Sequence, residues 1–338
     1  MATAGRHGII RHCARELPDL SIYVVTGGAG FIGSHLTTSL GQAGHEVRVL
    51  DNLSSAASRA RLSELADVPH VEFCEGDIRD ADVCCRVIQG ADYVLHQAGE
   101  ASVQRSVADP AECAQINIGG TINLLEAARQ AGTVKRFIFA STCAVYGDTP
   151  GASKHEATQT DPLSPYASSK MAGEYFCRNF FRLHGLQTVS LRYFNVYGPG
   201  QDPNADYAAV IPRFLTAITQ GKLPTLYGDG EQSRDFIFIA DIVEANLRAA
   251  AATRGVGGKV FNIGSGQSAS LKQVLEKLEY ILGRRLETEC QPARPGDIKH
   301  SRADISAAAG LLQFTPAVAL SAGLERTLQW YTEKTRGN

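Results

Sequence analysis

Ile22-Tyr23-Val24-Val25-Thr26-Gly27-Gly28-Ala29-Gly30-Phe31-Ile32-Gly33 is the stretch that decides the fold of this 338-residue chain. A β-branched and aromatic run, typical of a buried strand, ends in a turn dense in glycine that opens into a helix. The spacing Gly28-x-Gly30-x-x-Gly33 is typical of a dinucleotide-binding turn, because glycine permits a tight bend and lets backbone N–H groups approach a pyrophosphate. The spacing alone is weak, since a turn that only reverses the chain also favours glycine.

The next predicted strand supports the dinucleotide interpretation. It spans Glu46–Leu50 and ends at an acidic residue, Asp51. A carboxylate about twenty residues beyond the glycines can accept hydrogen bonds from the adenosine ribose hydroxyls, and it repels a 2′-phosphate. The two features together predict NAD, rather than NADP, as the cofactor.

Composition excludes several classes of function. A net charge of −2 and a charged fraction of 20% give no footprint for nucleic acid or for an anionic membrane surface. No apolar run approaches the ~20 residues of a membrane-spanning helix, and the N-terminal stretch lacks the apolar core of a secretory signal. The 8 cysteines show neither a CxxC pair nor zinc-ligand spacing, which favours reduced thiols and no metal. We therefore expect a cytoplasmic protein.

From Ile22 onward, strand-like and helix-like segments alternate, which predicts an α/β fold with a doubly wound parallel sheet. The predicted strands are Ile22–Val25, Glu46–Leu50, Val71–Cys74, Tyr93–His96, Phe137–Ala140, Thr188–Arg192 and Val260–Ile263, the last returning to the sheet from late in the chain. The predicted helices are Phe31–Leu40, Ala81–Gln89, Ile118–Gln130, Pro165–Leu183, Leu271–Leu282 and Leu320–Thr332.

The alternation breaks down after Tyr193, where prolines become frequent. We therefore predict two lobes. A Rossmann domain that binds NAD spans 20–192 and has return segments near 236–264, and a smaller α/β substrate-binding lobe is built from 193–235 and 265–335. Residues 1–19 form an N-terminal extension, in which Ile9–Leu17 is compatible with a short helix.

Polar residues beyond the carboxyl ends of the strands are candidates for ligand contacts, because open parallel sheets bind ligands at that edge. Asp77-Ile78 follows the third predicted strand and could hold the adenine edge. Gln97-Ala98 follows the fourth, where small neighbours let the backbone come close to a cofactor. Taken alone, each pair is explained as well by a solvated turn as by a contact with a ligand.

Two further segments carry candidate chemistry. Ser141-Thr142 directly follows the fifth predicted strand, and Ser164-Pro165-Tyr166-x-x-x-Lys170 opens the next long helix. Ser164 suits the N-cap and Pro165 the first helical position. Tyr166 and Lys170 are then one turn apart on one face of the helix.

This arrangement can activate a tyrosine. An unperturbed phenol, with a pKa of ~10, is a poor base at neutral pH. A cation one turn away and the positive end of the helix dipole favour the phenolate of Tyr166, and the hydroxyl of Thr142 can share its proton. On most helix surfaces this spacing is only a solvated lysine beside a packed tyrosine. The dinucleotide pattern and the Ser141-Thr142 pair favour catalysis here.

With these motifs the chain resembles the extended short-chain dehydrogenases/reductases of the NAD-dependent epimerase/dehydratase family, and within it the UDP-GlcNAc and UDP-glucose 4-epimerases. The resemblance runs from Ile22 nearly to the C-terminus. The segments that carry it are 26–33, Gly76-Asp77-Ile78-Arg79-Asp80, Ser141-Thr142 before Val145-Tyr146-Gly147, Tyr166-x-x-x-Lys170, Leu191-Arg192-Tyr193-Phe194-Asn195-Val196-Tyr197-Gly198-Pro199, Gly228-Asp229-Gly230-Glu231-Gln232-Ser233-Arg234-Asp235 and Arg294-Pro295-Gly296-Asp297.

The resemblance implies roles for individual residues. It implies that Thr142, Tyr166 and Lys170 are catalytic. It assigns the cofactor to Gly27, Gly30, Phe31, Ile32, Asp51, Asn52, Asp77, Ile78, Gln97, Ala98, Tyr166, Lys170 and Tyr193. It assigns the UDP-sugar to Ala101, Ser102, Ser141, Thr142, Asn195, Ala209, Val210, Thr225, Tyr227, Arg234, Arg294, Asp297 and Ser301, with Asn117 near sugar and cofactor. Arg234 and Arg294 match diphosphate-binding arginines, whose fork geometry suits phosphate oxygens.

The implied reaction is inversion at C4 of the sugar. Tyr166 phenolate takes the 4-hydroxyl proton, hydride passes to the nicotinamide, the 4-keto sugar turns over and hydride returns to its other face. Family 4,6-dehydratases carry Asp-Glu directly after the catalytic threonine, and the decarboxylases keep a glutamate two places after theirs. This chain has Cys143 and Ala144, which favours epimerisation. A UDP-glucuronate 4-epimerase, an NAD-dependent 4-ketoreductase and a non-catalytic NAD-binding regulator remain alternatives.

Three small residues bear on the substrate. Family members restricted to UDP-glucose and UDP-galactose have a tyrosine at the position of Ser301, a lysine at Ala101 and an asparagine at Ala209. Small residues at all three positions leave room for a 2-acetamido group, so we expect UDP-GlcNAc and UDP-GalNAc as substrates. Ser301 could instead only relax selectivity, since an open pocket rejects a small ligand by no more than ~1–3 kcal/mol.

The resemblance also implies a homodimer. The family pairs two long helices from each subunit into a four-helix bundle, which here would be Pro110–Gln130 and Pro165–Leu183. The apolar residues of these helices exceed what one sheet face should cover, although a surplus of core residues explains them as well.

Overall fold

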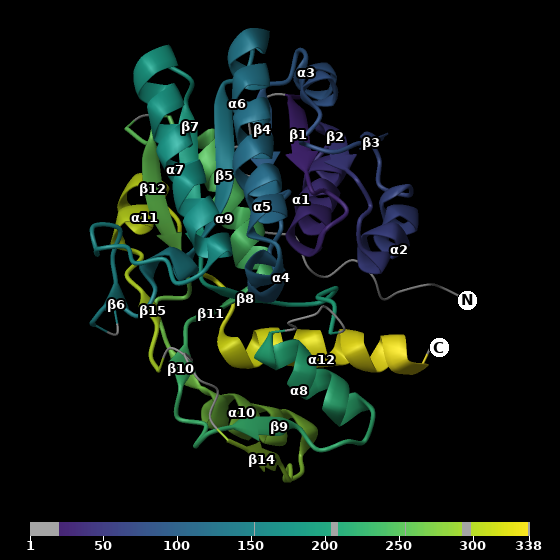
Figure 1. Ribbon diagram of the computed structural model, residues 1–338. Helices are drawn as coiled ribbons and strands as arrows, with labels where there is room; N and C mark the ends of the chain where they lie inside the picture. Colours follow the sequence, from purple (N-terminus) through teal and green to yellow (C-terminus); the bar gives the residue numbers. More distant parts are fainter. Residues whose placement is uncertain (1–19, 152, 204–208, 254, 293–298, 337–338) are drawn as a thin grey trace.

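The computed structural model describes residues 20–151, 153–203, 209–253, 255–292 and 299–336 (Figure 1). Its centre is a parallel sheet of 7 strands in the order β12-β7-β5-β4-β1-β2-β3. The order runs outward in both directions from β1, so the predicted doubly wound α/β fold is confirmed. The strands are β1 (Ile22–Thr26), β2 (Glu46–Asp51), β3 (Val71–Glu75), β4 (Tyr93–His96), β5 (Arg136–Thr142), β7 (Thr188–Tyr193) and β12 (Lys259–Ile263).

Helices cover both faces of this sheet (Figure 1). Alternate residues of one strand enter different cores: Tyr23 and Val25 pack in the core that contains α1 and α9, and Val24 packs in the core that contains α3, α6 and α7. Burial on both faces explains the continuous apolar run of β1. The helices around the sheet are α1 (Phe31–Gln42), α2 (Ala56–Leu65), α3 (Ala81–Ile88), α4 (Val103–Ala108), α5 (Pro110–Ala114), α6 (Gly120–Ala131), α7 (Pro165–His184) and α9 (Ile239–Ala251).

A smaller group of elements lies beyond the carboxyl edge of the sheet, at the bottom of Figure 1. It contains α8 (Val210–Thr219), α10 (Leu271–Leu282) and α12 (Leu320–Arg336), while α11 (Ser306–Leu311) packs near β12. Its strands form two-stranded ladders: β8 (Asn195–Tyr197) with β11 (Phe236–Phe238), β9 (Thr225–Tyr227) with β14 (Glu289–Gln291), β10 (Ser233–Arg234) with β13 (Ala269–Ser270), and β6 (Ser153–Lys154) with β15 (Arg302–Ala303).

The structure corrects several element boundaries. Ser141 and Thr142 do not follow the fifth strand but are its last two residues, paired with Arg192 and Tyr193 of β7. The helix expected from Ile118 begins at Gly120, because a turn of π-helix (Gln115–Gly119) joins α5 to α6. Sequence patterning missed α2 altogether, since its polar sequence has no apolar face.

The late strand β12 does return to the sheet, where it pairs in parallel with β7, as predicted. No helix in the described part of the chain is long and apolar enough to cross a membrane. The expected helix at Ile9–Leu17 lies outside the described residues.

Candidate active site

The glycine-rich turn after β1 is built too tightly for side chains. Gly27 has φ +66°, and a Cβ there would lie 2.7 Å from the backbone nitrogen of Ala98. A Cβ on Gly33 would lie 2.0 Å from the carbonyl oxygen of Gly27. Both glycines are therefore required for the close approach of strand, turn and α1 that a dinucleotide-binding loop needs.

Asp51 ends β2 beside this turn. Its Oδ2 accepts a hydrogen bond from the Ala29 backbone N–H at 3.0 Å, and its Oδ1 accepts one from Leu53 N–H at 2.9 Å. Burial raises the pKa of the carboxyl, while these two hydrogen bonds oppose the rise. The turn and the acid expected to bind the ribose therefore form one unit, which fits NAD.

The ends of β2 and β3 bring three predicted cofactor residues together. Asn52 donates to Asp77 Oδ2 at 2.9 Å, and Arg79 pairs with the same carboxylate at 2.8 Å. Hydrogen bonding with Arg79 lowers the pKa of Asp77 to about 2. Ile78, between them, is buried against Gly120 of α6. Asp77 is therefore a fixed, ionised acceptor at the edge where the adenine is expected.

Two other predicted cofactor residues meet beneath this edge. The Tyr193 hydroxyl donates to Gln97 Oε1 at 3.3 Å, and both side chains hydrogen-bond Asn246 of α9. The polar ends of Tyr193 and Gln97 are therefore hydrogen-bonded to each other and to Asn246. Asn246 was missed by sequence reasoning, since a single buried asparagine in a helix gives no pattern. Phe31 and Ile32 pack against the hydrophobic core that contains the ring of Tyr193. The backbone N–H of Ala98 donates to Thr26 Oγ1 at 3.3 Å.

The predicted catalytic residues are brought together where α7 crosses the end of β5. Ser164 caps α7 by accepting from Ala167 N–H at 3.2 Å, and Pro165 opens it, as expected. This places Tyr166 on the first turn, within hydrogen-bonding reach of Thr142. Lys170, one turn later, donates to the carbonyl of Ala140 at 2.9 Å and is 6% exposed.

The protonation states differ from the sequence-based expectation. Burial raises the pKa of Tyr166 to about 12, and hydrogen bonding with Thr142 only partly opposes this. Burial lowers the pKa of Lys170 to about 8, and its Nζ lies 5.0 Å from the centre of the Phe139 ring. Lys170 and the helix dipole do not by themselves make a phenolate at neutral pH, because desolvation penalises both charged forms.

A third turn of α7 continues this contact with β5. Glu174 lies one turn beyond Lys170, and its Oε1 accepts from the Ser141 hydroxyl at 2.5 Å. Arg192 of β7 clamps the same carboxylate at 2.8 and 2.7 Å, and both charged side chains are 6% exposed. The Ser141 hydroxyl, expected from the sequence to contact the sugar, donates into this buried network. Tyr166, Lys170 and Glu174 fasten α7 to residues 142, 140 and 141 of β5.

The loop after β4 approaches Lys170 from the other side. Asn117, 2% exposed, accepts from Glu100 N–H at 2.7 Å and donates to Ser169 Oγ at 2.9 Å. A Cβ on Gly99 would lie 3.3 Å from Lys170 Nζ. Asn117 thus fixes the loop whose next residues are the predicted substrate contacts. Of these, Ala101 is exposed, and Ser102 caps α4.

Two segments of the smaller lobe reach the end of β5. The charges of Asp235 and Arg234 act on the thiol of Cys143, whose pKa burial raises to about 12. Arg234 donates to the carbonyls of Ser233 at 3.0 Å and Lys299 at 3.3 Å. Ser301 N–H donates to Ser233 O at 3.1 Å. The structure therefore brings Arg234 and Ser301 to adjacent segments.

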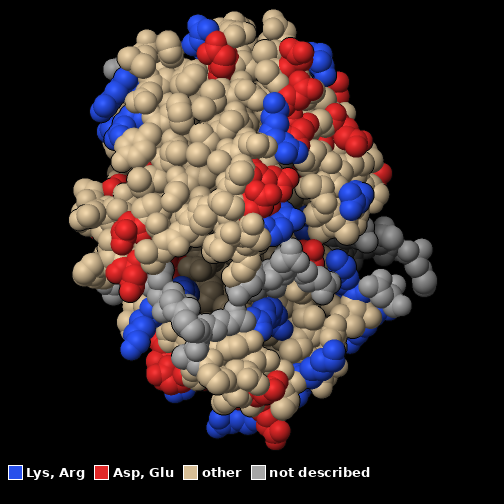
Figure 2. All heavy atoms as spheres, viewed as in Figure 1, with Lys and Arg blue, Asp and Glu red and all other residues tan. Residues whose placement is uncertain are grey.

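Asn195 belongs to the same group of contacts, because its Nδ2 donates to the Asp235 carbonyl at 3.2 Å. Figure 2 shows the surface hollowed between the sheet and the smaller lobe, on the face where these segments meet. Arg294 and Asp297 lie outside the described residues. Ala209 is exposed and immediately precedes α8, which begins at Val210.

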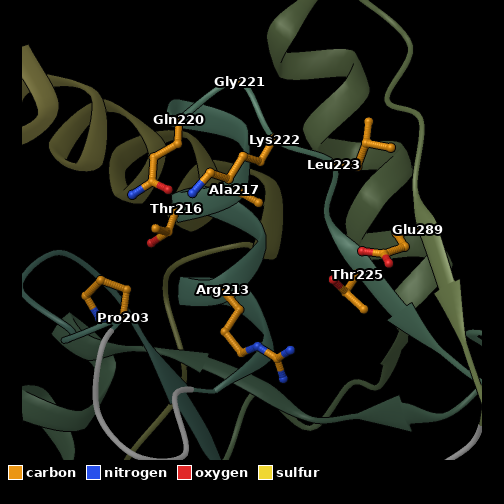
Figure 3. A pocket seen from close by; sticks show the side chains of 10 residues that line it. All are labelled: Pro203, Arg213, Thr216, Ala217, Gln220, Gly221, Lys222, Leu223, Thr225 and Glu289. Atoms are coloured by element: carbon orange, nitrogen blue, oxygen red, sulfur yellow. The ribbon is translucent and has the colours of Figure 1, made fainter.

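A second hollow, of about 600 Å³, lies between α8 and β9 and is shown in Figure 3. Thr225, a predicted uracil contact, lines it together with Arg213 and Glu289. The Arg213 guanidinium lies 5.3 Å from the ring centre of Tyr227, the other predicted uracil contact. Arg213 was not singled out from the sequence, where nothing connects it to a tyrosine fourteen positions away.

Comparison with known proteins identifies the family. The model of the NAD-dependent epimerase/dehydratase family matches residues 23–264. The chain belongs to this family. It is 37% identical to a UDP-glucose 4-epimerase of Mycolicibacterium smegmatis over 93% of this chain and 99% of that one. It is accordingly an enzyme of the isomerase class that uses NAD, which confirms the predicted cofactor.

Solved structures agree. A UDP-N-acetylglucosamine 4-epimerase from Methanobrevibacter ruminantium has a TM-score of 0.88 and 38% identity, covering 94% of this chain and 100% of its own. A UDP-glucuronic acid 4-epimerase from Bacillus cereus, solved with UDP-glucuronic acid and NAD, has a TM-score of 0.85 and 33% identity, covering 93% and 99%. These neighbours share the fold and differ in the sugar that their names state.

Proposed function

We propose that this enzyme inverts C4 of a UDP-hexose through a transient 4-keto sugar. The observation that carries the proposal is the meeting of Thr142 and Tyr166 at the end of β5, beside Lys170. Cys143 and Ala144 follow Thr142, and neither is a carboxylate that could remove water or assist decarboxylation. The set is therefore sufficient to move one proton at one hydroxyl, which is what epimerisation needs.

The side chains divide the work. Tyr166 Oη accepts the proton of the sugar 4-hydroxyl and later returns it, and the Thr142 hydroxyl holds that oxygen in place. NAD would supply a positive charge that opposes the high pKa of Tyr166 and a reversible hydride acceptor for C4 of the sugar. Lys170 donates a hydrogen bond to Ala140 O. At a pH below its pKa of about 8 it is charged and places a cation on the second turn of α7. The glycine-rich turn and Asp51 hold the dinucleotide.

The preferred substrates in this proposal are UDP-GlcNAc and UDP-GalNAc, with activity toward UDP-glucose and UDP-galactose as a weaker reaction. Ser301, Ala101 and Ala209 offer little bulk where a 2-acetamido group needs space. The segment bearing Ser301 is held beside Arg234 by the hydrogen bond from Ser301 N–H to Ser233 O. The likeness to the Methanobrevibacter UDP-N-acetylglucosamine 4-epimerase supports this choice.

The test compares kcat/KM for the acetamido and plain hexose pairs in wild type and Ser301→Tyr. We expect the tyrosine to lower the value for UDP-GlcNAc by about 10–100-fold and to leave UDP-glucose within a few-fold. Ser306→Tyr, at an exposed position nearby, is the matched control. Equal turnover of UDP-GlcNAc by Ser301→Tyr and wild type would refute the substrate proposal.

A UDP-glucuronate 4-epimerase is the second candidate, because curated and solved relatives with that name match along the whole fold. The same assay series includes UDP-glucuronate, and a higher kcat/KM for it than for either hexose pair would select this function. Stoichiometric oxidation of added NADH would instead select the 4-ketoreductase. Absence of any turnover with NAD bound would select a regulator.

We further propose a cytoplasmic homodimer and the lobe boundaries given above. The helices α5 and α6 follow one another end to end through the π-helical turn, and α7 lies beside both (Figure 1). Tyr175 and Leu183 on α7 are 46% and 75% exposed. Covering such side chains with a second copy is favourable. Light scattering at micromolar concentration should give twice the monomer mass of 36.2 kDa. A monomer mass would refute the dimer.

A further inference from the structure

Three consecutive carbonyls after β8 are held by side chains from three distant elements. The ring of His35, on α1, contacts Pro199 O through Nε2 at 2.9 Å. Arg61, on α2, donates to Gly200 O, and the Tyr331 hydroxyl, on α12, donates to Gln201 O at 2.5 Å. We call residues 199–201 the strap.

The strap is joined directly to the cofactor loop. The same guanidinium of Arg61 that holds Gly200 also donates, through Nη1, to the carbonyl of Ala29 at 3.2 Å. Ala29 lies in the glycine-rich turn, and its N–H is the donor to Asp51. One arginine therefore ties the strap to the turn that receives the pyrophosphate and to the acid expected at the ribose.

The contacts of the strap involve buried and closely packed groups. Tyr331 is 4% exposed. Gly200 has φ +85°, and a Cβ there would lie 3.7 Å from His35 Nε2. Burial lowers the pKa of the Arg61 guanidinium, and the nearby carboxylates of Asp202 and Asp51 oppose this by favouring its charged form. The strap continues the chain from β8, which carries Asn195, toward α8, so it connects the cofactor loop with the proposed substrate lobe.

We propose that the strap is the latch that retains NAD: the dinucleotide leaves only when residues 199–201 detach from Arg61, His35 and Tyr331. A hydrogen bond to a charged group contributes more than one between neutral groups. Detachment breaks one bond of the first kind and two others at once. Retention suits an enzyme that regenerates its NAD in every cycle, because no exchange is needed between turnovers.

The test measures cofactor dissociation from purified holoenzyme loaded with NADH and chased with excess NAD, followed by the loss of bound-NADH fluorescence. Arg61→Met removes both donors, and we expect dissociation to accelerate about 10–100-fold, the range that corresponds to one charged hydrogen bond. Arg86→Met is the control, since Arg86 is an exposed arginine near the end of a different helix, α3. Equal rates for the two variants would overturn the proposal.

Tyr331→Phe separates a latch from simple support of the glycine-rich turn. Tyr331 holds the far end of the strap and has no hydrogen bond to that turn in the described chain. A latch requires faster dissociation, about 2–10-fold for one neutral hydrogen bond, compared with Tyr280→Phe at an 88% exposed position. An unchanged rate would show that Arg61 acts only on the turn and would refute the latch. Because dissociation is measured without UDP-sugar, the outcome is independent of the proposed reaction.

Discussion

The two sides of the active site are built differently. On the sheet side, Thr142, Lys170 and Glu174 are each less than one-tenth exposed and are held by hydrogen bonds between α7, β5 and β7. On the lobe side, Arg234 and Tyr227 are half-buried and lie on ladders of only 2 strands. In the proposed function, the rigid side fixes the position of the proton-transferring group, and the open side presents side chains to the sugar. Chemistry and selectivity can therefore change independently, as the names of the structural neighbours suggest.

The largest expected effect on activity comes from the sheet side, where the hydroxyl of Tyr166 is removed. Tyr166→Phe is expected to lower kcat by about 10²–10⁴-fold, because the proton acceptor is lost. Bound NAD should remain, since the glycine-rich turn and Asp51 are untouched. The measurement is a UDP-hexose interconversion assay, with cofactor content read from absorbance after denaturation. Activity within a few-fold of wild type would place the proton transfer elsewhere.

The same contrast explains what the sequence could and could not predict. The glycine-rich turn after β1, the end of β2 at Asp51 and the Ser164-Pro165 start of α7 are local patterns. The structure confirms the turn, the strand end and the helix start, because each depends on a few neighbouring residues. Contacts across the sheet leave no such pattern. The bond of Glu174 with Arg192, 18 positions apart, follows from the neighbouring positions of β5, β7 and α7.

The protonation states of Tyr166 and Lys170 could not be predicted from the sequence either. The spacing of Tyr166 and Lys170 suggested a phenolate, but the pKa of a side chain depends on how much water the fold removes around it. Lys170 donates to Ala140 O, and burial moves the pKa of Tyr166 upward to about 12. The short ladders of the smaller lobe were missed for a related reason, since strands of 2 or 3 residues carry no periodicity.

A pair of matched charge changes tests whether the sheet side is the stable one. Glu174→Gln leaves Arg192 buried without its counter-ion, and we expect the free energy of unfolding to fall by about 3–5 kcal/mol. Glu231→Gln removes a carboxylate that pairs with Lys272 at 2.6 Å on the smaller lobe, where the two side chains are 59% and 49% exposed. Solvent already screens that pair, so the urea midpoint should not change. Equal losses in both variants would refute the contrast.

The smallest expected effect lies at Arg213, which lines the hollow of Figure 3 and whose guanidinium lies 5.3 Å from the ring centre of Tyr227. In the proposed function this contact orients the ring beside the uracil and takes no part in proton transfer. A cation–π contact at a half-exposed site contributes about 0.5–1 kcal/mol, which corresponds to about 2–5-fold in binding. Arg213→Leu should therefore raise KM for the UDP-sugar by that factor and leave kcat unchanged. Lys222→Leu, which removes a cation from the same hollow without a ring contact in the described chain, is the control. A fall in kcat for Arg213→Leu would mean that the lobe side also controls the chemistry, and the division between the two sides would no longer hold.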